Sequence, residues 1–169
     1  MTDDGRADRA AHARVVQRLR DQADDVRRLV AGLDDESLSK RTVPDKWSLK
    51  ELVCHVLKVQ QVFFERLERM LAEENPSVTS YTADADAGFP RLTALPAEQA
   101  LAAYFTERER YLDRLEDLSP GQWHRSARHP EFPNYDVHFQ TDYLAHHEAH
   151  HIYQMLQRRA PFGKLPPEG

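Results

Sequence analysis

The chain has 169 residues and a formal net charge of −5, with 30% charged and 40% hydrophobic residues. This length and mixture predict a single soluble domain over residues 1–169, and the acidic balance argues against nucleic-acid binding. The single cysteine, Cys54, excludes an intramolecular disulfide and favours a reducing cytoplasm; no apolar run is long enough to cross a bilayer, so no membrane partner is expected.

The first predicted element is an amphipathic helix over about residues 8–33. Its apolar side chains recur every three or four positions, at Val15, Leu19, Ala23, Val26, Val30 and Leu33. Gly32 and the following Asp34-Asp35 pair mark its end. Residues 1–7 are polar and show no secretory signal, and residues 160–169 are rich in proline; both segments are expected to be loose tails.

A second helix is predicted after a connector over residues 34–47. Ser48 and Glu51 have the spacing of a capping box, in which each side chain bonds the other's backbone N–H. The apolar seam that follows comprises Leu49, Leu52, Val56, Val59, Phe63, Leu67 and Met70. His55 lies beside this seam, where an imidazole needs a polar partner. That partner is either a neighbouring core group or a metal ion. Cys54 is interpreted as a small packed residue.

Residues 76–95 show no sustained periodicity and are predicted to form a long loop between the second and third helices. Long loops inside compact domains are often functional, and this one is expected to cross the mouth of a site. Asp84 and Asp86 are candidates to approach a metal ion there. The simpler interpretation is that both are solvated loop carboxylates.

Two further helices complete the prediction. Pro96 begins the third, since proline is favoured in the first turn, and its stripe runs from Leu101 to Leu115. A capped turn over 119–123 and an irregular segment over 124–136, with His124 and His129 exposed, lead to a fourth helix that ends near Arg159. Four helices without a convincing strand predict an all-α four-helix bundle, and the long second connection indicates a topology other than simple up-and-down.

Four of the nine histidines lie in the fourth helix, at positions 146, 147, 150 and 151. His146 with His150, and His147 with His151, are pairs at i,i+4 that lie one turn apart on one side of a helix. On a helical wheel His147 and His151 fall at the edge of the apolar sector, whereas His146 and His150 fall opposite. His147 and His151 are therefore predicted to face a pocket. The alternative is that all four histidines lie on a solvated surface.

Two segments resemble signatures of the DinB-like family. Lys46-Trp-Ser-Leu-Lys-Glu-Leu-Val-Cys-His55 is similar to the family's Trp-Ser-…-His segment, and His147-Glu-Ala-His-His151-Ile-Tyr-Gln154 to its His-x-x-x-His-x-x-Gln segment. The resemblance in order and spacing covers nearly the whole chain. It implies a four-helix bundle that binds one divalent metal ion, zinc, nickel, iron or manganese, through His55, His147 and His151. The second histidine pair and the 80–90 loop have no clear family counterpart.

The resemblance also implies candidate activities. The family includes enzymes that use low-molecular-weight thiols, among them S-transferases and mycothiol-dependent isomerases, so a thiol cofactor and a small-molecule substrate are expected. Metal sites with three protein ligands keep positions open for such molecules. The catalytic side chains themselves stay unassigned.

Other functions are compatible with the same residues. His147-Glu148-x-x-His151 matches the pattern of zinc hydrolases in which the glutamate is a general base, but the third ligand that usually follows downstream is missing. Glu148 is nevertheless a candidate to assist a metal-bound nucleophile. A non-catalytic metal-binding or dimerising module is the third possibility. Phe139, Tyr143, His146 and His150 share one side of the helix, which predicts an exposed aromatic strip and a homodimer.

Overall fold

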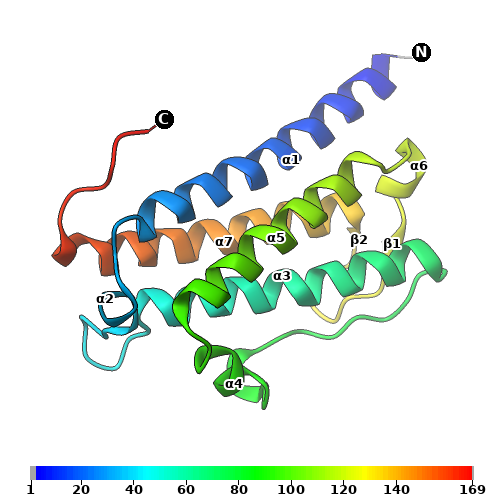
Figure 1. The fold of residues 1–169 in the computed structure, drawn as a ribbon. Coiled ribbons are helices and arrows are strands. Elements are labelled where there is room, and N and C mark those ends of the chain that lie inside the picture. The colour runs from blue at the N-terminus through cyan, green and yellow to red at the C-terminus, as the bar shows by residue number, and fades with distance from the viewer. Residues whose placement is uncertain (1–2, 169) are drawn as a thin grey trace.

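The computed structural model describes residues 3–168, and four long helices form a bundle (Figure 1). The long helices are α1 (Asp3–Val30), α3 (Leu49–Ala72), α5 (Ala97–Glu116) and α7 (Val137–Arg159). These correspond to the four predicted helices. The all-α four-helix bundle with a long connection between the second and third helices is therefore confirmed.

The bundle is not a simple up-and-down arrangement. Gln60 and Glu68 of α3 bond to Tyr104 and Arg114 of α5 respectively, so these two helices run in the same direction. The connection over residues 73–96 makes this possible by returning along the length of the bundle before α5 begins (Figure 1). In the same view α1 and α7 run together in the opposite direction. The parallel α3–α5 pair accounts for the length of the second connection.

Short elements lie outside the long helices, where only the capped turn over 119–123, now α6, was predicted. They are α2 (Asp35–Ser39), the 3₁₀ turn η1 (Ala83–Ala85), α4 (Phe89–Thr93), α6 (Pro120–Trp123), β1 (Ser126–Ala127), β2 (Tyr135–Asp136) and the 3₁₀ turn η2 (Ala160–Phe162). The predicted loop over 76–95 thus contains η1 and α4, and β1 pairs antiparallel with β2 where no strand was expected. Elements of two to five residues are too short to produce a periodic pattern.

Local capping signals place the helix starts. Ser48 accepts a hydrogen bond from the Glu51 backbone, and Glu51 accepts one from Ser48, as the capping box predicts. Asp136 caps α7 by accepting from the Phe139 backbone N–H at 2.8 Å. These caps fix where α3 and α7 begin, and so the register of the histidines they carry.

The expectation of loose tails is wrong for the described part of both ends. The α1 helix begins at Asp3, earlier than predicted, with Asp3 and Asp4 in its first turn, where negative charge is favourable. At the other end, the guanidinium of Arg28 donates to the Pro166 carbonyl oxygen at 2.9 Å, and Leu165 packs against the core. Residues 163–168 are non-helical but attached to α1.

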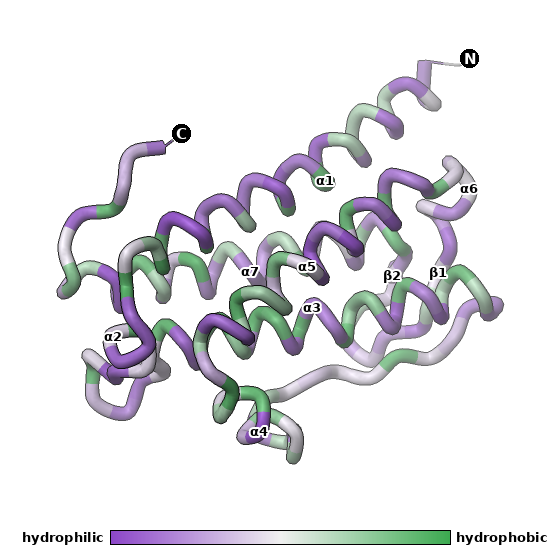
Figure 2. The backbone as a smooth tube through the Cα atoms, in the orientation of Figure 1, coloured by the Kyte–Doolittle hydropathy of each residue, from purple (hydrophilic) through white to green (hydrophobic). Residues whose placement is uncertain are grey.

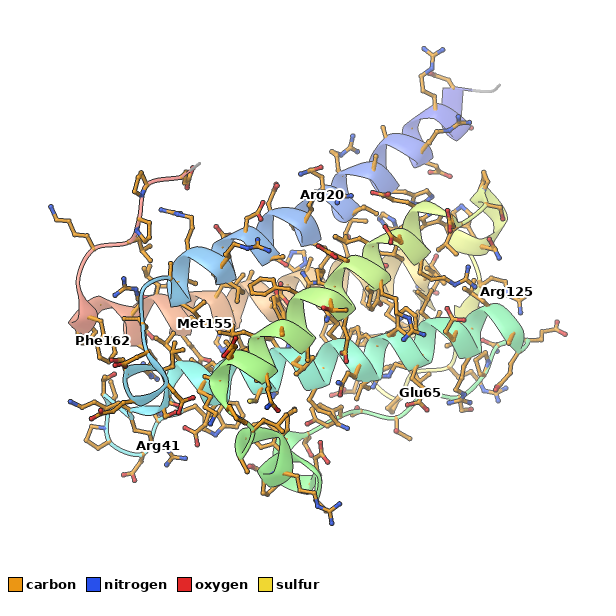
Figure 3. All side chains as sticks on the ribbon, viewed as in Figure 1. Arg20, Arg41, Glu65, Arg125, Met155 and Phe162 are labelled. Carbon is orange, nitrogen blue, oxygen red and sulfur yellow. The ribbon has the colours of Figure 1, made fainter. Side chains whose placement is uncertain are left out.

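The core lies between the four long helices, each of which carries hydrophobic residues interspersed with hydrophilic ones (Figure 2). Leu19, Leu57 and Leu67 have no exposed surface. Met155 is buried, whereas Arg20 lies on the outside (Figure 3). Among residues 3–168, no helix combines the length and hydropathy needed to span a membrane.

The predicted aromatic strip on α7 is only partly exposed. Tyr143 packs against Phe63 with ring centroids 5.2 Å apart, and Phe132 packs against both Phe139 and Tyr143. The 124–136 segment, which carries Phe132, therefore covers aromatic rings that the helical wheel placed on the outside. His124 is exposed as predicted, whereas the ring of His129 is half-buried and stacks on Tyr135.

Candidate metal centre

Three imidazoles from two helices converge in the bundle. The Nε2 atom of His147 on α7 lies 3.3 Å from Nε2 of His55 on α3 and 3.1 Å from Nε2 of His151. Within residues 3–168, these side chains form the one group of three or more His, Cys, Asp or Glu residues whose ligand atoms all lie within 4.8 Å of one another. The structure thus brings together the three histidines that the sequence singled out.

The other pair on α7 does not join this cluster. His146 and His150 are exposed, and Nδ1 of His146 lies 2.8 Å from the Asp142 carbonyl oxygen one turn earlier. The i,i+4 spacing gives both pairs the same local geometry. Only the rotation of α7 against α3 directs His147 and His151 inward, as the helical wheel predicted.

Burial keeps the clustered imidazoles neutral. Desolvation, reinforced by His151, lowers the pKa of His55 to about 4. Desolvation together with the neighbouring His151 and His55 lowers the pKa of His147 to about 3, and desolvation also lowers the pKa of His151. A neutral imidazole carries a free nitrogen lone pair, which is the form that binds a metal ion.

Gln154 fixes the protonation pattern of His151. Its Oε1 lies 2.7 Å from Nδ1 of His151, so this nitrogen carries the proton and donates it, which leaves Nε2 with a lone pair toward the cluster. Nδ1 of His55 and of His147 is buried without a hydrogen-bond partner among the described residues. The sequence analysis included Gln154 in the motif but assigned it no role. Its position three residues after His151 places the two side chains on the same face of the helix, which could have indicated this contact.

These observations fit a divalent metal ion. Three neutral nitrogen donors, all within 4.8 Å of one another, supply the ligand set of an open imidazole site. The donors come from two helices, α3 and α7. His55 on α3 and His147 on α7 are 92 positions apart in the chain. A bound ion would therefore connect the two helices.

Glu148, the candidate general base, lies in the core instead of at the cluster. Its side chain is 1% exposed, and its two oxygens accept hydrogen bonds from the guanidinium of Arg108. The Tyr104 hydroxyl adds a further hydrogen bond to Oε1 at 3.1 Å. A carboxylate that is buried and paired with a guanidinium in this way lacks the access to a substrate that proton abstraction requires. The interpretation of Glu148 as an assisting base is therefore wrong.

The partner of Glu148 was not recognised from the sequence. Arg108 falls within the predicted apolar stripe of the third helix, between Leu101 and Leu115, and its side chain is 1% exposed. It also donates to the Leu19 backbone carbonyl at 2.8 Å and to Gln60 Oε1. A charged residue inside an apolar stripe was the available signal. Because Glu148 lies between His147 and His151, this contact helps to set the rotation of α7 that directs both histidines toward α3.

Three aromatic side chains from outside the long helices lie near His55. Its ring centroid lies 5.0 Å from that of Trp47 and 6.4 Å from those of Tyr81 and Phe89. Tyr81 and Phe89 belong to the 76–95 segment, and all three rings are half-buried. The segment therefore lies next to the histidine cluster.

The acidic residues of this segment do not contribute metal ligands. Asp86 accepts hydrogen bonds from the Tyr81 hydroxyl and the Gly88 backbone N–H, both at 2.9 Å, and lies 3.8 Å from the ammonium of Lys58. Asp84 is exposed. Asp86 thus holds the loop in shape and attaches it to α3, one turn beyond His55.

The fold and the histidine cluster define a class of protein, namely four-helix bundles with a three-histidine site able to hold a metal ion. The chain belongs to the DinB superfamily, whose family model matches residues 18–155. The match spans all three clustered histidines and Gln154.

Individual relatives agree with this assignment. A protein of Oceanobacillus iheyensis named "putative metal-dependent hydrolase" is 30% identical over 73% of this chain and 70% of its own. A protein of the same name from Bacillus mycoides is 23% identical over 85% of this chain and 83% of its own. The structure of YfiT from Bacillus subtilis, described as "a probable metal-dependent hydrolase with an unusual four-helix bundle topology", superimposes with a TM-score of 0.76 at 19% identity, covering 90% of this chain and 87% of that one.

Proposed function

We propose that the chain binds one divalent metal ion through Nε2 of His55, His147 and His151 and is a metal-dependent thiol transferase or isomerase acting on a small molecule. The observation that carries this proposal is the convergence of three neutral imidazoles, those of the buried His55 and His151 and the half-buried His147. Three protein ligands leave coordination positions open, as in catalytic metal sites. The donors do not rank zinc, nickel, iron and manganese, because imidazole suits several of these metals.

The position of Glu148 favours a thiol as the nucleophile. A divalent ion in such a site lowers the pKa of a coordinated thiol or water and so supplies a nucleophile at neutral pH. With Glu148 bound to Arg108, the glutamate that would serve as general base in a zinc hydrolase is not available to the site. A thiol needs such a base least, since its free pKa of about 8.5 lies far below the value of about 15.7 for water.

The aromatic side chains near His55 support a substrate with an apolar or aromatic group. Trp47, Tyr81 and Phe89 are half-buried and offer ring surfaces beside the cluster. Pockets for small molecules are commonly lined by such rings with a few polar groups to orient the ligand. The single buried thiol, Cys54, supports a cytoplasmic location, where such thiol cofactors are reduced.

Hydrolysis is the second candidate, because the relatives named above are called metal-dependent hydrolases. In this candidate the nucleophile is water, and the chain contributes the three imidazoles that hold the ion and the aromatic rings that hold the substrate. Glu148 has no part in it.

The experiment separates these functions in one series. Protein freed of metal is reloaded with each of the four ions and assayed for conjugation of 1-chloro-2,4-dinitrobenzene with mycothiol, bacillithiol, cysteine or glutathione, and for hydrolysis of 4-nitrophenyl acetate. We expect metal-dependent conjugation that His147→Ala abolishes and the matched exposed variant His146→Ala retains. Hydrolysis without conjugation would select the second candidate. Stoichiometric metal binding with neither activity would indicate a non-catalytic metal-binding module.

A further inference from the structure

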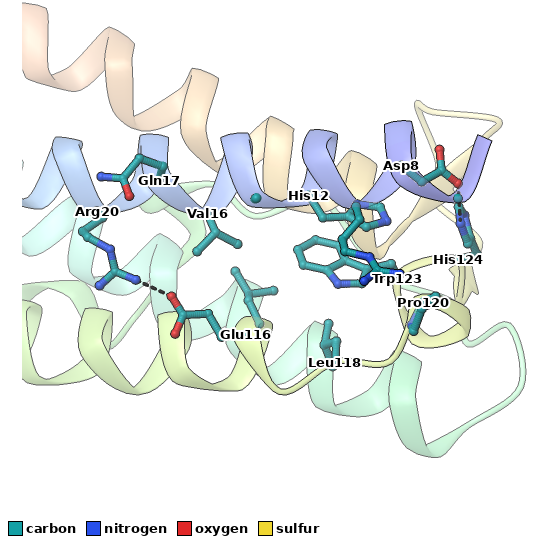
Figure 4. Close-up of a pocket in the computed structure, with 14 residues that line it drawn as sticks. Asp8, His12, Val16, Gln17, Arg20, Glu116, Leu118, Pro120, Trp123 and His124 are labelled. Atoms are coloured by element: carbon teal, nitrogen blue, oxygen red, sulfur yellow. Dashed lines mark hydrogen bonds and ion pairs between the residues drawn. The ribbon is translucent and has the colours of Figure 1, made fainter. Parts of the chain in front are cut away.

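A cavity of about 640 Å³ lies at the opposite end of the bundle from the histidine cluster, between the first turns of α1 and the α5–α6 corner (Figure 4). Next to it, His12 of α1 contacts His138 near the start of α7. His138 precedes His147 by nine residues, which corresponds to about 14 Å along the helix axis. The cavity is therefore separate from the candidate metal centre, and its volume lies within the range of small-molecule sites.

The walls of the cavity are mainly apolar. Val16 of α1, Leu115, Leu118 and Trp123 of α6 all line it. Figure 4 shows Val16 on α1 across from Leu118, with Trp123 beside them. All four side chains are at least nine-tenths buried with respect to solvent. The imidazole of His12 stacks on the indole of Trp123, with centroids 4.3 Å apart and planes inclined by 4°. A flat aromatic surface thus lies beside aliphatic ones.

The charges at the rim are already balanced. Arg20 forms an ion pair with Glu116, and Asp8 lies 3.5 Å from Nε2 of His124 (Figure 4). The fourth charged lining residue, Arg9, brings the arginines to two against two carboxylates. A rim of this composition attracts neither anions nor cations strongly. It suits a ligand without net charge.

His12 lines the cavity and carries one polar atom that lacks a partner. Nδ1 of His12 lies 2.8 Å from Nδ1 of His138, but Nε2 of His12 is buried and has no hydrogen-bond partner among the described residues. Burial, together with His138 and His124, lowers the pKa of His12, so the ring is neutral. A buried, unpaired ring nitrogen destabilises the free protein, and a ligand that bonds to it removes that cost.

We propose that this cavity is a second binding site, for an uncharged small molecule with a largely apolar body and one hydroxyl or amine group directed at Nε2 of His12. The apolar walls bind the body of the ligand, and the His12–Trp123 stack holds the nitrogen in place. The site is independent of the metal-dependent function proposed above, because its lining includes none of the three clustered histidines.

The test uses the metal-loaded protein and the neutral fluorescent amine N-phenyl-1-naphthylamine. We expect saturable binding of one molecule per chain with a rise in its fluorescence. Ala13→Trp, which fills the cavity from an exposed position on α1, should abolish binding; Gln17→Trp tests the same point if the first variant is unstable. The matched control is Ala102→Trp, exposed on α5 and about 20 Å along that helix from Leu115, which should bind normally.

A pair of competing ligands tests the role of His12. 2-Naphthol and 2-methylnaphthalene have similar shapes, but only the first carries a hydroxyl group. In the wild type we expect naphthol to displace the amine more effectively by about two- to tenfold, the range of one net hydrogen bond. His12→Phe keeps a ring against Trp123 and should remove this difference, whereas His138→Leu should keep it.

Each alternative result counts against the proposal. Absence of saturable binding to the wild type, or undiminished binding to folded Ala13→Trp and Gln17→Trp, would show that the cavity is not a ligand site. A naphthol preference that persists in His12→Phe would remove the assigned role of His12.

Discussion

The buried ion pair between Arg108 and Glu148 gives the sharpest prediction. Both side chains are 1% exposed, and the guanidinium contacts both carboxylate oxygens. In Arg108→Met the carboxylate keeps only the Tyr104 hydroxyl as a partner. Removing one member of a buried pair leaves an uncompensated charge in the core, whereas replacing both members with apolar groups of similar volume does not.

The expected magnitude follows from this burial. Loss of one partner of a buried pair costs about 3 to 5 kcal/mol of unfolding free energy, which for a domain of this size lowers the melting temperature by about 6 to 20 °C. The double variant Arg108→Met, Glu148→Leu should recover most of this loss. Because Glu148 lies between two of the clustered histidines, the single variant should also bind metal more weakly.

Urea unfolding of the four proteins of this double-mutant cycle, followed by circular dichroism, measures the coupling energy. Glu148→Gln adds a functional readout: a general base replaced by glutamine would leave stability intact and remove activity, whereas we expect lower stability and retained turnover in the folded, metal-loaded fraction. An Arg108→Met variant that loses less than about 1 kcal/mol, or a double variant whose losses simply add, would refute the reasoning.

Three further predictions concern the histidines, the cysteine and assembly. Alanine variants of the proposed ligands His55, His147 and His151 should lose most bound metal by elemental analysis and melt at the temperature of the chelated wild type, because metal binding stabilises the folded state. The exposed variants His146→Ala and His150→Ala should keep about one ion per chain; their loss of metal would mean that the site is wrongly placed. Cys54 is fully buried, and burial raises the pKa of its thiol to about 11, so iodoacetamide at pH 8 should label it only after unfolding; rapid labelling of the folded protein would contradict this burial. We also propose a homodimer through the exposed face of α7, where Tyr153 is 61% and Leu156 43% exposed; light scattering should give twice the chain mass, and a monomeric mass at micromolar concentration would rule it out.

Local signals in the sequence were sufficient for the long helices and for the facing of one histidine pair. The Ser48–Glu51 capping box and the i,i+4 spacing of His147 and His151 each depend on residues within one turn, so a short stretch of chain contains the whole interaction. The assignment of His55 came from the family resemblance, since periodicity alone allowed a core histidine with an ordinary polar partner.

Only the tertiary structure decided what each helix faces across the bundle. The residues around Glu148 match a zinc hydrolase motif, which predicts a general base. Its actual partner, Arg108, is 40 residues away on α5, so the motif does not reveal the ion pair. The rings beside His55 likewise come from the connector and the long loop, in segments too short or irregular to have a period. The stack of His12 on Trp123 was also not predictable, because Trp123 lies in a short turn far from His12 in the sequence. Such contacts depend on helix rotation and on the path of the connections, and these are set by the packing of the whole core.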